Sequence, residues 1–264
     1  MWTTARRASR GIVAATLSAV LISTGATHVK APALSPRLAK LPHVTVWVWE
    51  RREDLRELDS TTTAVAYLDR TLVLDSRGLT VVPRRQPMLL PASTSLVQIA
   101  VVRLEVAEGT PLDDAQAEAV ADAASEVARE THPAALQIDF DARRSERVWY
   151  AQVLRRIRAR MPAGMPLSIT ALASWCSYDG DWLRDLPVDE AVPMLFRMEP
   201  DRLRAHTGPE ASGDFKLRQP LCLTSVGIST RELWPRDLAS RRIYIFPDHG
   251  WAADNLSETV RSLK

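Results

Sequence analysis

Short apolar runs recur along the chain and are separated by polar or charged segments. Runs of four to eight residues that are rich in branched and aromatic side chains are typical of buried strands. Eight such runs predict strands, at residues 44–50, 64–68, 96–104, 136–143, 167–174, 191–197, 221–228 and 242–246. Because most of the segments between them have crossover length, the pattern predicts an α/β fold, a (β/α)8 TIM-type barrel.

Apolar residues at helical spacing predict helices between several of these strands. One helix begins at Pro111 and ends at the pair His132 and Pro133, and another covers residues 145–161. Two late helices are expected, at residues 233–239 and 252–263.

The second βα unit departs from this pattern. Residues 72–74 and 79–82 are apolar runs on either side of a turn, which predicts a hairpin where a helix would be expected. The second unit of the barrel is therefore predicted to be degenerate. A doubly wound sheet is the alternative fold, but it would need a glycine-rich first turn, and the sequence has no G-x-G-x-x-G or P-loop string.

Residues 1–33 have the pattern of a targeting segment. Arg6, Arg7 and Arg10 form a positively charged region, and the apolar run at residues 11–26 follows them. The pattern predicts a secretory signal, with an uncleaved N-terminal anchor as the alternative, because the run is shorter than the roughly 18 residues of a spanning helix. Residues 34–264 are then expected to form a single barrel domain of an exported protein, periplasmic or extracellular.

The charge of the chain is nearly balanced, since its 264 residues include 34 Lys and Arg against 32 Asp and Glu. Without a basic stripe no nucleic-acid partner is expected, and membrane contact is expected only through an uncleaved N-terminal segment. The five histidines show no ligand spacing, so no metal and no cofactor is predicted. A solvated face, rather than a binding patch, is predicted for the arginines of the helix at 145–161, namely Arg155, Arg156, Arg158 and Arg160. The oligomeric state stays open.

Export would place the two cysteines of the chain in an oxidising compartment, where disulfides can form. Cys176 is placed at the end of one predicted strand and Cys222 at the start of another. In a parallel barrel these are opposite ends, so the pattern predicts two free, buried thiols and no disulfide.

The predicted fourth strand carries two carboxylates on one face. Leu136, Ile138 and Phe140 alternate with a polar row that contains Asp139 and Asp141. The apolar face is suited to packing under helices. The polar row must pair, be solvated or act in chemistry.

Five strings read like one protein family. They are VWVWERR at 46–52, VVRLE at 101–105, LQIDFD at 136–141, LSITALASW at 167–175 and DEAV at 189–192. Together they resemble the bacterial family catalogued as domain of unknown function 3142, which is uncharacterised, and the likeness covers most of residues 34–264.

The fourth strand also has a looser similarity to chitinase-type family 18 glycoside hydrolases. That family has alternating acids on this strand followed by a catalytic Glu. Asp139 and Asp141 match the alternating acids, whereas Arg143 stands where the Glu would follow. The similarity implies a sugar-handling barrel with acids at the carboxyl ends of its strands, and the arginine argues against substrate-assisted chitinase chemistry.

In such barrels the chemistry gathers at the carboxyl ends of the strands, the mouth of the barrel. The candidate catalytic residues there are Asp141, Asp139, Glu105 and Glu50. The candidate substrate-binding residues are Arg103, Trp49, Tyr67, Trp175, Arg197 and Trp251. Asp189 and Glu190 precede their strand and are expected to stabilise the opposite end.

Among the candidates, Asp141 is expected to be the catalytic carboxylate nearest the mouth. Glu105 or Glu50 would be its partner, because glycoside hydrolysis usually needs two carboxyl groups. Asp139 would orient them from below, and Arg103 would act as charge partner or substrate clamp. The alternative is a closed ion-pair network of Arg103, Glu105, Asp139 and Asp141 without turnover.

The first strand offers two ways of facing the barrel. Branched residues favour the barrel interior, so the valines are predicted to fill it, with Glu50 in the mouth and Trp47 packed as core against the helices. The tryptophans that follow strands are the better candidates for stacking on a ligand, namely Trp175, Trp182, Trp234 and Trp251.

The sequence therefore predicts an exported carbohydrate-active barrel whose ligand is a glycan or another small polar molecule. It would act as a glycoside hydrolase with paired carboxylates at the mouth, or as a non-catalytic glycan-binding or envelope-interaction protein. Two carboxylates that converge on a groove flanked by Trp would favour the enzyme. Carboxylates held by Arg103 without a groove would favour the binding protein.

Overall fold

The computed structural model describes residues 34–93, 95–196, 217–232, 234–235, 238–252 and 254–263. Parallel strands pair side by side through the described residues and close on themselves, because the last strand pairs with the first. The strands of this barrel, in their order around it, are β1 (Val44–Val48), β3 (Thr63–Asp75), β6 (Gln98–Val106), β7 (Ala135–Asp139), β8 (Leu167–Leu172), β9 (Glu190–Met194), β10 (Ser225–Ser229) and β11 (Arg242–Phe246). The predicted (β/α)8 barrel is confirmed.

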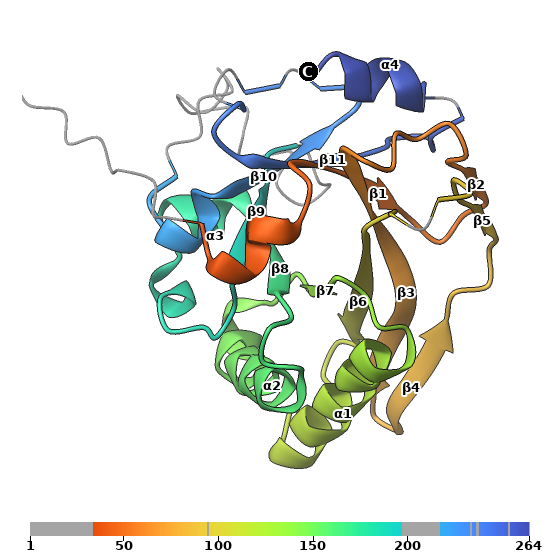
Figure 1. Ribbon diagram of the computed structural model, residues 1–264. Helices are drawn as coiled ribbons and strands as arrows, with labels where there is room; N and C mark the ends of the chain where they lie inside the picture. Colours follow the sequence, from red (N-terminus) through yellow and green to blue (C-terminus); the bar gives the residue numbers. More distant parts are fainter. Residues whose placement is uncertain are drawn as a thin grey trace, which may run out of the picture. The chain divides into compact units, whose positions relative to one another are not determined.

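Helices cover the outside of the strands. The α-helices are α1 (Asp114–Glu130), α2 (Arg147–Arg160), α3 (Ala173–Ser177) and α4 (Leu256–Arg261), and the 3-10 helices are η1 (Pro36–Lys40), η2 (Arg144–Glu146), η3 (Asp181–Leu183) and η5 (Pro220–Cys222). Figure 1 shows α1 and α2 side by side below β6, β7 and β8. Part of the helix predicted at residues 233–239 lies outside the described residues, and its described residues are not helical. No helix within the described ranges is long and apolar enough to span a membrane.

The second unit of the barrel is a hairpin, as predicted. β3 runs on past the barrel and pairs antiparallel with β4 (Gly78–Pro83), and the tight turn between them is permitted by the positive φ of 117° at Gly78. A register shift at Asp69 keeps the later part of β3 in the sheet. A separate two-stranded ribbon joins β2 (Glu53–Asp54) to β5 (Met88–Leu89).

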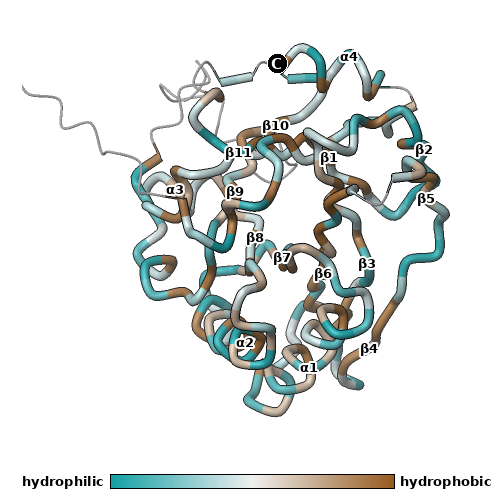
Figure 2. The backbone as a smooth tube through the Cα atoms, viewed as in Figure 1, coloured by the Kyte–Doolittle hydropathy of each residue, from teal (hydrophilic) through white to brown (hydrophobic). Residues whose placement is uncertain are grey.

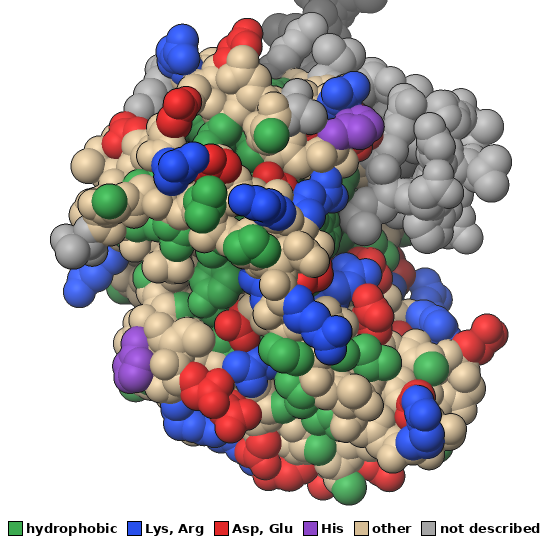
Figure 3. Space-filling model, turned by 90° about the vertical axis from the view of Figure 1, so that its right-hand side faces the viewer, with side chains coloured by type: hydrophobic (Ala, Val, Ile, Leu, Met, Phe, Trp, Pro, Cys, Tyr) green, Lys and Arg blue, Asp and Glu red, His purple; other side chains and the backbone are tan. Residues whose placement is uncertain are grey.

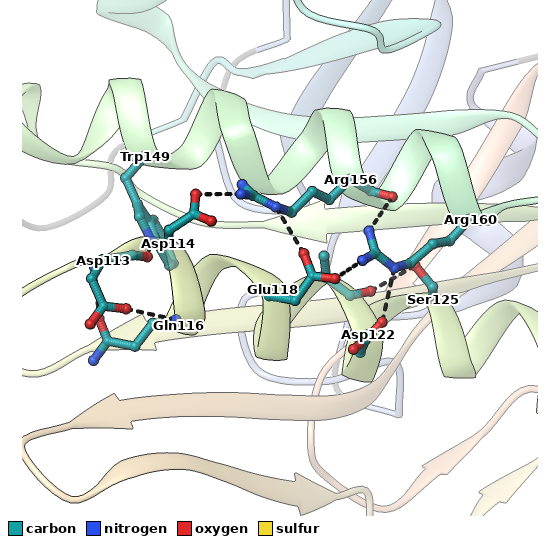
Figure 4. A network of polar contacts seen from close by, with 10 residues as sticks. Asp113, Asp114, Gln116, Glu118, Asp122, Ser125, Trp149, Arg156 and Arg160 are labelled. Carbon is teal, nitrogen blue, oxygen red and sulfur yellow. Dashed lines mark hydrogen bonds and ion pairs between the residues drawn. The ribbon is translucent and has the colours of Figure 1, made fainter.

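The arginines of α2 hold it to α1. Arg156 and Arg160 reach the carboxylates of Asp114, Glu118 and Asp122, which follow one another at four-residue spacing along α1 (Figure 4). Within the predicted solvated face, these two arginines are about a quarter exposed and pair with the acids of the neighbouring helix.

The core has two layers, one inside the barrel and one between the strands and the helices. The face of β1 that points into the barrel is the opposite of the predicted one. Val44, Val46 and Val48 pack outward in the layer between strands and helices. Trp47 lies inside the barrel, fully buried, with its ring stacked on Phe246 at 4.5 Å between centroids. Small residues on neighbouring strands, Ala64 and Ala66 among them, leave room for so large a ring. Trp47 is thus core, as expected, but on the other face of the strand. In Figure 2 the hydrophobic colour is concentrated on barrel strands such as β1 and β6.

The prediction of two free thiols is wrong, since Cys176 and Cys222 form a disulfide. Cys176 does not stay at the end of β8, because α3 carries it into the outer layer, against β9. The backbone N–H groups of Arg218 and Gln219 donate to the Cys176 carbonyl at 2.8 and 3.2 Å, so the segment before β10 runs beside α3 and brings Cys222 to it.

The end of the barrel opposite the mouth is held by buried ion pairs. Asp189 accepts the backbone N–H of Leu167 at 2.9 Å and the guanidinium of Arg158 at 2.6 Å. Glu190 is fully buried, and it accepts the Tyr244 hydroxyl at 2.6 Å and Arg242 Nε at 3.3 Å. Both acids stabilise this end, as the sequence predicted.

Candidate functional site

The carboxyl ends of β6 and β7 bring three of the predicted site residues together. Arg103 and Asp139 are register partners on these neighbouring strands. The Arg103 guanidinium donates through Nη1 to Asp139 at 2.8 Å and through Nε to Glu105 at 2.9 Å. One arginine therefore joins a buried acid to an exposed one.

Asp139 is held on both of its oxygens. Its Oδ2 accepts from Arg103, and its Oδ1 accepts from the Thr170 hydroxyl of β8 at 2.7 Å. Asp139 is only 3% exposed. Its geometry suits a residue that orients its neighbours, because a buried carboxylate with these partners has little freedom to move.

A shallow, open pocket of about 190 Å³ lies beside this pair. Its lining consists of Arg103, Leu104, Glu105, Val106, Phe140, Asp141, Arg143 and Glu146. Asp141 is exposed, and the side chain of Glu105 is 51% exposed. Two acids from adjacent strand ends thus share one solvent-accessible pocket, and no tryptophan is among the lining residues that the structure describes.

Glu146 also lines the pocket, although it was not among the predicted site residues. Its Oε2 accepts the backbone N–H of Arg143 at 2.7 Å, and its Oε1 lies 3.8 Å from Arg143 Nε. The carboxylate turns back onto the chain just before α2. An acid three residues into a helix start is the signal that identifies such a group in sequence.

Glu50 does not belong to this pocket. Its Oε1 accepts the backbone N–H groups of Arg85 and Gln86 at 2.8 and 3.0 Å, so it fastens the loop before β5. Of the two partners considered for Asp141, the structure brings only Glu105 into the same pocket.

The predicted aromatic residues are mostly packed away from solvent. Trp175 and Trp251 are 1% and 2% exposed, and Trp251 Nε1 donates to the Trp47 carbonyl at 2.8 Å. Trp49 is half-buried against Trp47 and Phe246.

Two more predicted residues remain, and the structure describes only one of them, Tyr67. Tyr67 faces outward in the layer below the helices, where burial raises the pKa of its hydroxyl although Thr131 hydrogen-bonds to it. Arg197 lies outside the described residues.

A further buried acid, Glu53, lies on β2. Its Oε2 accepts the backbone N–H of Trp251 at 2.9 Å, and its Oε1 lies 3.9 Å from Arg51 Nε. Burial raises the pKa of this carboxyl, and the Trp251 N–H and the Arg51 charge oppose that shift only in part. Glu53 fastens the segment that follows β11.

The described residues contain no group of three or more His, Cys, Asp or Glu side chains arranged to hold a metal ion. On the face seen in Figure 3, basic and acidic side chains are interspersed. The pocket itself combines both charges, which suits a polar ligand with many hydroxyl groups.

The segment that holds this pocket matches a protein-family model. Residues 95–187 match the family model of a domain of unknown function (DUF3142). The DUF3142 match includes Arg103, Glu105, Asp139, Asp141 and the other pocket residues. The resemblance that the sequence predicted is thereby confirmed for this stretch. The search of curated proteins found no match.

Several solved structures are similar to the chain. A provisionally assigned chitinase A from Streptomyces coelicolor matches with a TM-score of 0.51 at 9% identity, covering 84% of this chain and 95% of that one. The spore cortex-lytic enzyme SleL of Bacillus cereus matches at a TM-score of 0.43 and 14% identity over 71% of this chain. The chitinase domain of the spore coat protein CotE from Clostridium difficile matches at 0.44 and 15% over 89% of this chain.

The chain spans 51% of the SleL structure and 63% of the CotE domain. Together with the strand pairing, the match to the S. coelicolor structure shows a (β/α)8 barrel fold. This is a relationship of fold.

Proposed function

We propose that the protein binds a glycan at the mouth of the barrel and hydrolyses it with Asp141 and Glu105. The observation that carries the proposal is that these two acids, from neighbouring strand ends, line one open pocket. Hydrolysis of a glycosidic bond usually needs two carboxyl groups that flank the bond, one as acid and one as nucleophile or base. The similarity in fold to a protein assigned as a chitinase makes a glycan the first ligand to test.

The surrounding groups have supporting roles in this proposal. Asp141 is the exposed carboxylate nearest the ligand, and Glu105 is its partner. Asp139, held by Thr170, fixes the guanidinium of Arg103, and Arg103 in turn holds Glu105. Arg103 also stays 30% exposed at its side chain, so it is available to a hydroxyl or carboxylate of the ligand.

A second candidate function, glycan binding without cleavage, is favoured by the same arginine. Arg103 already pairs with Asp139 and with Glu105, so the carboxylate of Glu105 is engaged before any ligand arrives. The described lining of the pocket also lacks tryptophan. Both candidates use one pocket, and they differ only in whether a bond is broken.

The test is a panel of soluble glycans that includes chitin oligosaccharides, with the full-length protein. We expect product release by the native protein and loss of it in Asp141→Asn, with an unchanged melting temperature in both. Asp185→Asn is the matched control, because Asp185 is an exposed acid outside the pocket lining and should leave cleavage unchanged. If the native protein cleaves nothing but its melting temperature rises with a glycan, the binding function is correct; if neither occurs with any glycan, both candidates fail.

We also propose that the protein is exported through the signal at residues 1–33, which lie outside the described residues. The Cys176–Cys222 disulfide supports this, because disulfides persist in oxidising compartments and are rare in the cytosol. A fusion of residues 1–33 to a reporter that is active only after export would be inactive if the proposal is wrong.

A further inference from the structure

Tyr178 is an exposed aromatic residue in the segment that follows β8. Its exposed fraction is 66%, and the other large hydrophobic residues that are exposed in the described ranges are aliphatic. The tryptophans that the sequence offered for stacking, such as Trp175 and Trp251, are buried instead. A single exposed ring is common on protein surfaces, so its placement has to carry the argument.

The position of Tyr178 is set by contacts on both sides. Its backbone N–H donates to the Ser174 carbonyl at 3.1 Å, which places it at the end of α3. The next residue, Asp179, accepts Arg147 Nη2 at 2.7 Å and Arg144 Nη2 at 3.1 Å. These ion pairs join the segment after β8 to the start of α2, so the ring is carried on a fastened segment.

The anchor of this segment is itself packed. The Arg147 guanidinium lies over the rings of Trp175 and Trp182, at 5.7 and 5.5 Å from their centroids. A stacked guanidinium that also pairs with a carboxylate loses little further freedom on ligand binding. Asp179 and the adjoining Tyr178 are therefore held before any ligand arrives.

The same contacts tie the segment of Tyr178 to the chain that lines the pocket. Arg143 and Glu146 line the pocket, and Arg144, which lies between them in sequence, is one of the two arginines that pair with Asp179. The side chain of Arg144 is 82% exposed, so its remaining donors face solvent. An exposed ring and an exposed guanidinium are thus carried on the segments that follow β8 and β7, and Arg144 is the sequence neighbour of the pocket residue Arg143.

The pocket is too small to enclose a long glycan by itself. Its volume of about 190 Å³ is below the roughly 300–1,000 Å³ of sites that enclose a drug-sized ligand. A glycan of several sugar rings would therefore extend past its rim. There an aromatic face packs against the C–H groups of a sugar ring, while a guanidinium binds its hydroxyl groups.

We propose that Tyr178 and Arg144 form an outer sugar-binding subsite next to the pocket, so that the protein prefers longer glycan chains. This inference rests on the proposed glycan binding at the pocket. It adds chain-length selectivity and assigns it to residues outside the pocket.

The experiment measures the affinity of the full-length protein for a chitin disaccharide and a chitin hexasaccharide by calorimetry. We expect the native protein to bind the hexasaccharide more tightly. Tyr178→Ala should weaken hexasaccharide binding by about three- to tenfold and leave disaccharide binding unchanged, since an aromatic contact is worth about that factor. Tyr178→Phe keeps the ring and should restore the native affinity. Val81→Ala, at an exposed aliphatic residue on β4, is the matched control and should change neither affinity.

The outcomes separate this inference from the function on which it rests. If the native protein binds the hexasaccharide and Tyr178→Ala binds it equally well, the outer subsite is wrong while glycan binding stands. If Tyr178→Ala weakens both ligands equally, Tyr178 belongs to the pocket and the inference is also wrong. If the native protein binds neither chitin ligand, the inference fails, and the broader glycan panel alone decides the proposed function.

Discussion

Asp139 and Asp141 are two residues apart on one strand face, yet the structure gives them different surroundings. Asp139 is buried with Arg103 and Thr170 on its two oxygens, whereas Asp141 is exposed and lines the pocket. A carboxylate keeps its charge in the interior only when such donors compensate for lost hydration. The two acids have the same chemistry, so their different exposure and hydrogen bonding come from their neighbours.

Removing the Thr170 hydroxyl should destabilise the protein. Thr170→Val keeps the shape of the side chain but leaves Asp139 Oδ1 without its donor, in a region closed to water. We expect the free energy of unfolding to fall by about 1–3 kcal/mol, measured by denaturant titration. Thr170→Ser retains the hydroxyl and should lose less. Equal losses in both variants would show that packing, and not the hydrogen bond, is what Thr170 contributes.

Glu53 should make stability depend on pH in the direction opposite to most carboxylates. Burial raises its pKa above the ordinary 4.5, so the fold disfavours the ionised form. The contribution of Glu53 to the free energy of unfolding is fully present below pH 4.5. It is lost as the pH rises through the raised pKa of the folded state. Glu53→Gln removes this titration. We expect the stability of the native protein relative to Glu53→Gln to fall as the pH rises above the ordinary 4.5; a constant difference would contradict the assignment.

At the scale of elements, α1 and α2 are joined by a row of surface ion pairs. Glu118 accepts both Arg156 and Arg160, and Asp114 and Asp122 extend the row on either side (Figure 4). The side chain of Glu118 is 49% exposed, so water and salt weaken these pairs.

Glu118→Gln should therefore have a small, salt-dependent effect. We expect a loss of less than about 1 kcal/mol in the free energy of unfolding at low salt, which shrinks towards zero near 1 M NaCl. Glu108→Gln, at an exposed acid in the loop before α1, serves as the control. A loss that is unchanged by salt would assign the effect to helix packing rather than to charge.

At the scale of the whole molecule, the disulfide joins segments that are 46 residues apart in sequence. It connects the helix after β8 to the segment before β10, so it bridges across β9.

Replacing both cysteines by alanine should lower the free energy of unfolding by about 2–4 kcal/mol, measured by denaturant titration, because the unfolded chain then gains freedom. Alkylation of the denatured native protein provides the direct check on the bond. We expect no alkyl label on the chain before reduction and two labels after reduction. Uptake of two labels before reduction would mean that the cysteines are free.

The strands, their order and the degenerate second unit could be predicted from sequence, because each depends on local periodicity and turn residues. The alternation of Leu136, Ile138 and Phe140 with the polar row on β7 likewise assigned the two faces correctly. For β1 the predicted inward face was wrong. Val46 and Trp47 are both apolar, and which one faces inward depends on how much room Ala64 and Ala66 leave on the next strand.

The candidate site shows the same division. The sequence by itself determined that acids and an arginine stand at the ends of β6 and β7, since parallel strands bring their carboxyl ends to one rim. Only the tertiary structure decided that Asp139 is held while Asp141 and Glu105 share a pocket, and that Glu50 is elsewhere. Likewise, α3 and the segment before β10 pass beside each other and pair the cysteines. The physical reason is that hydrogen bonds, burial and disulfides depend on distances in space between residues far apart in sequence, and local patterns do not contain these distances.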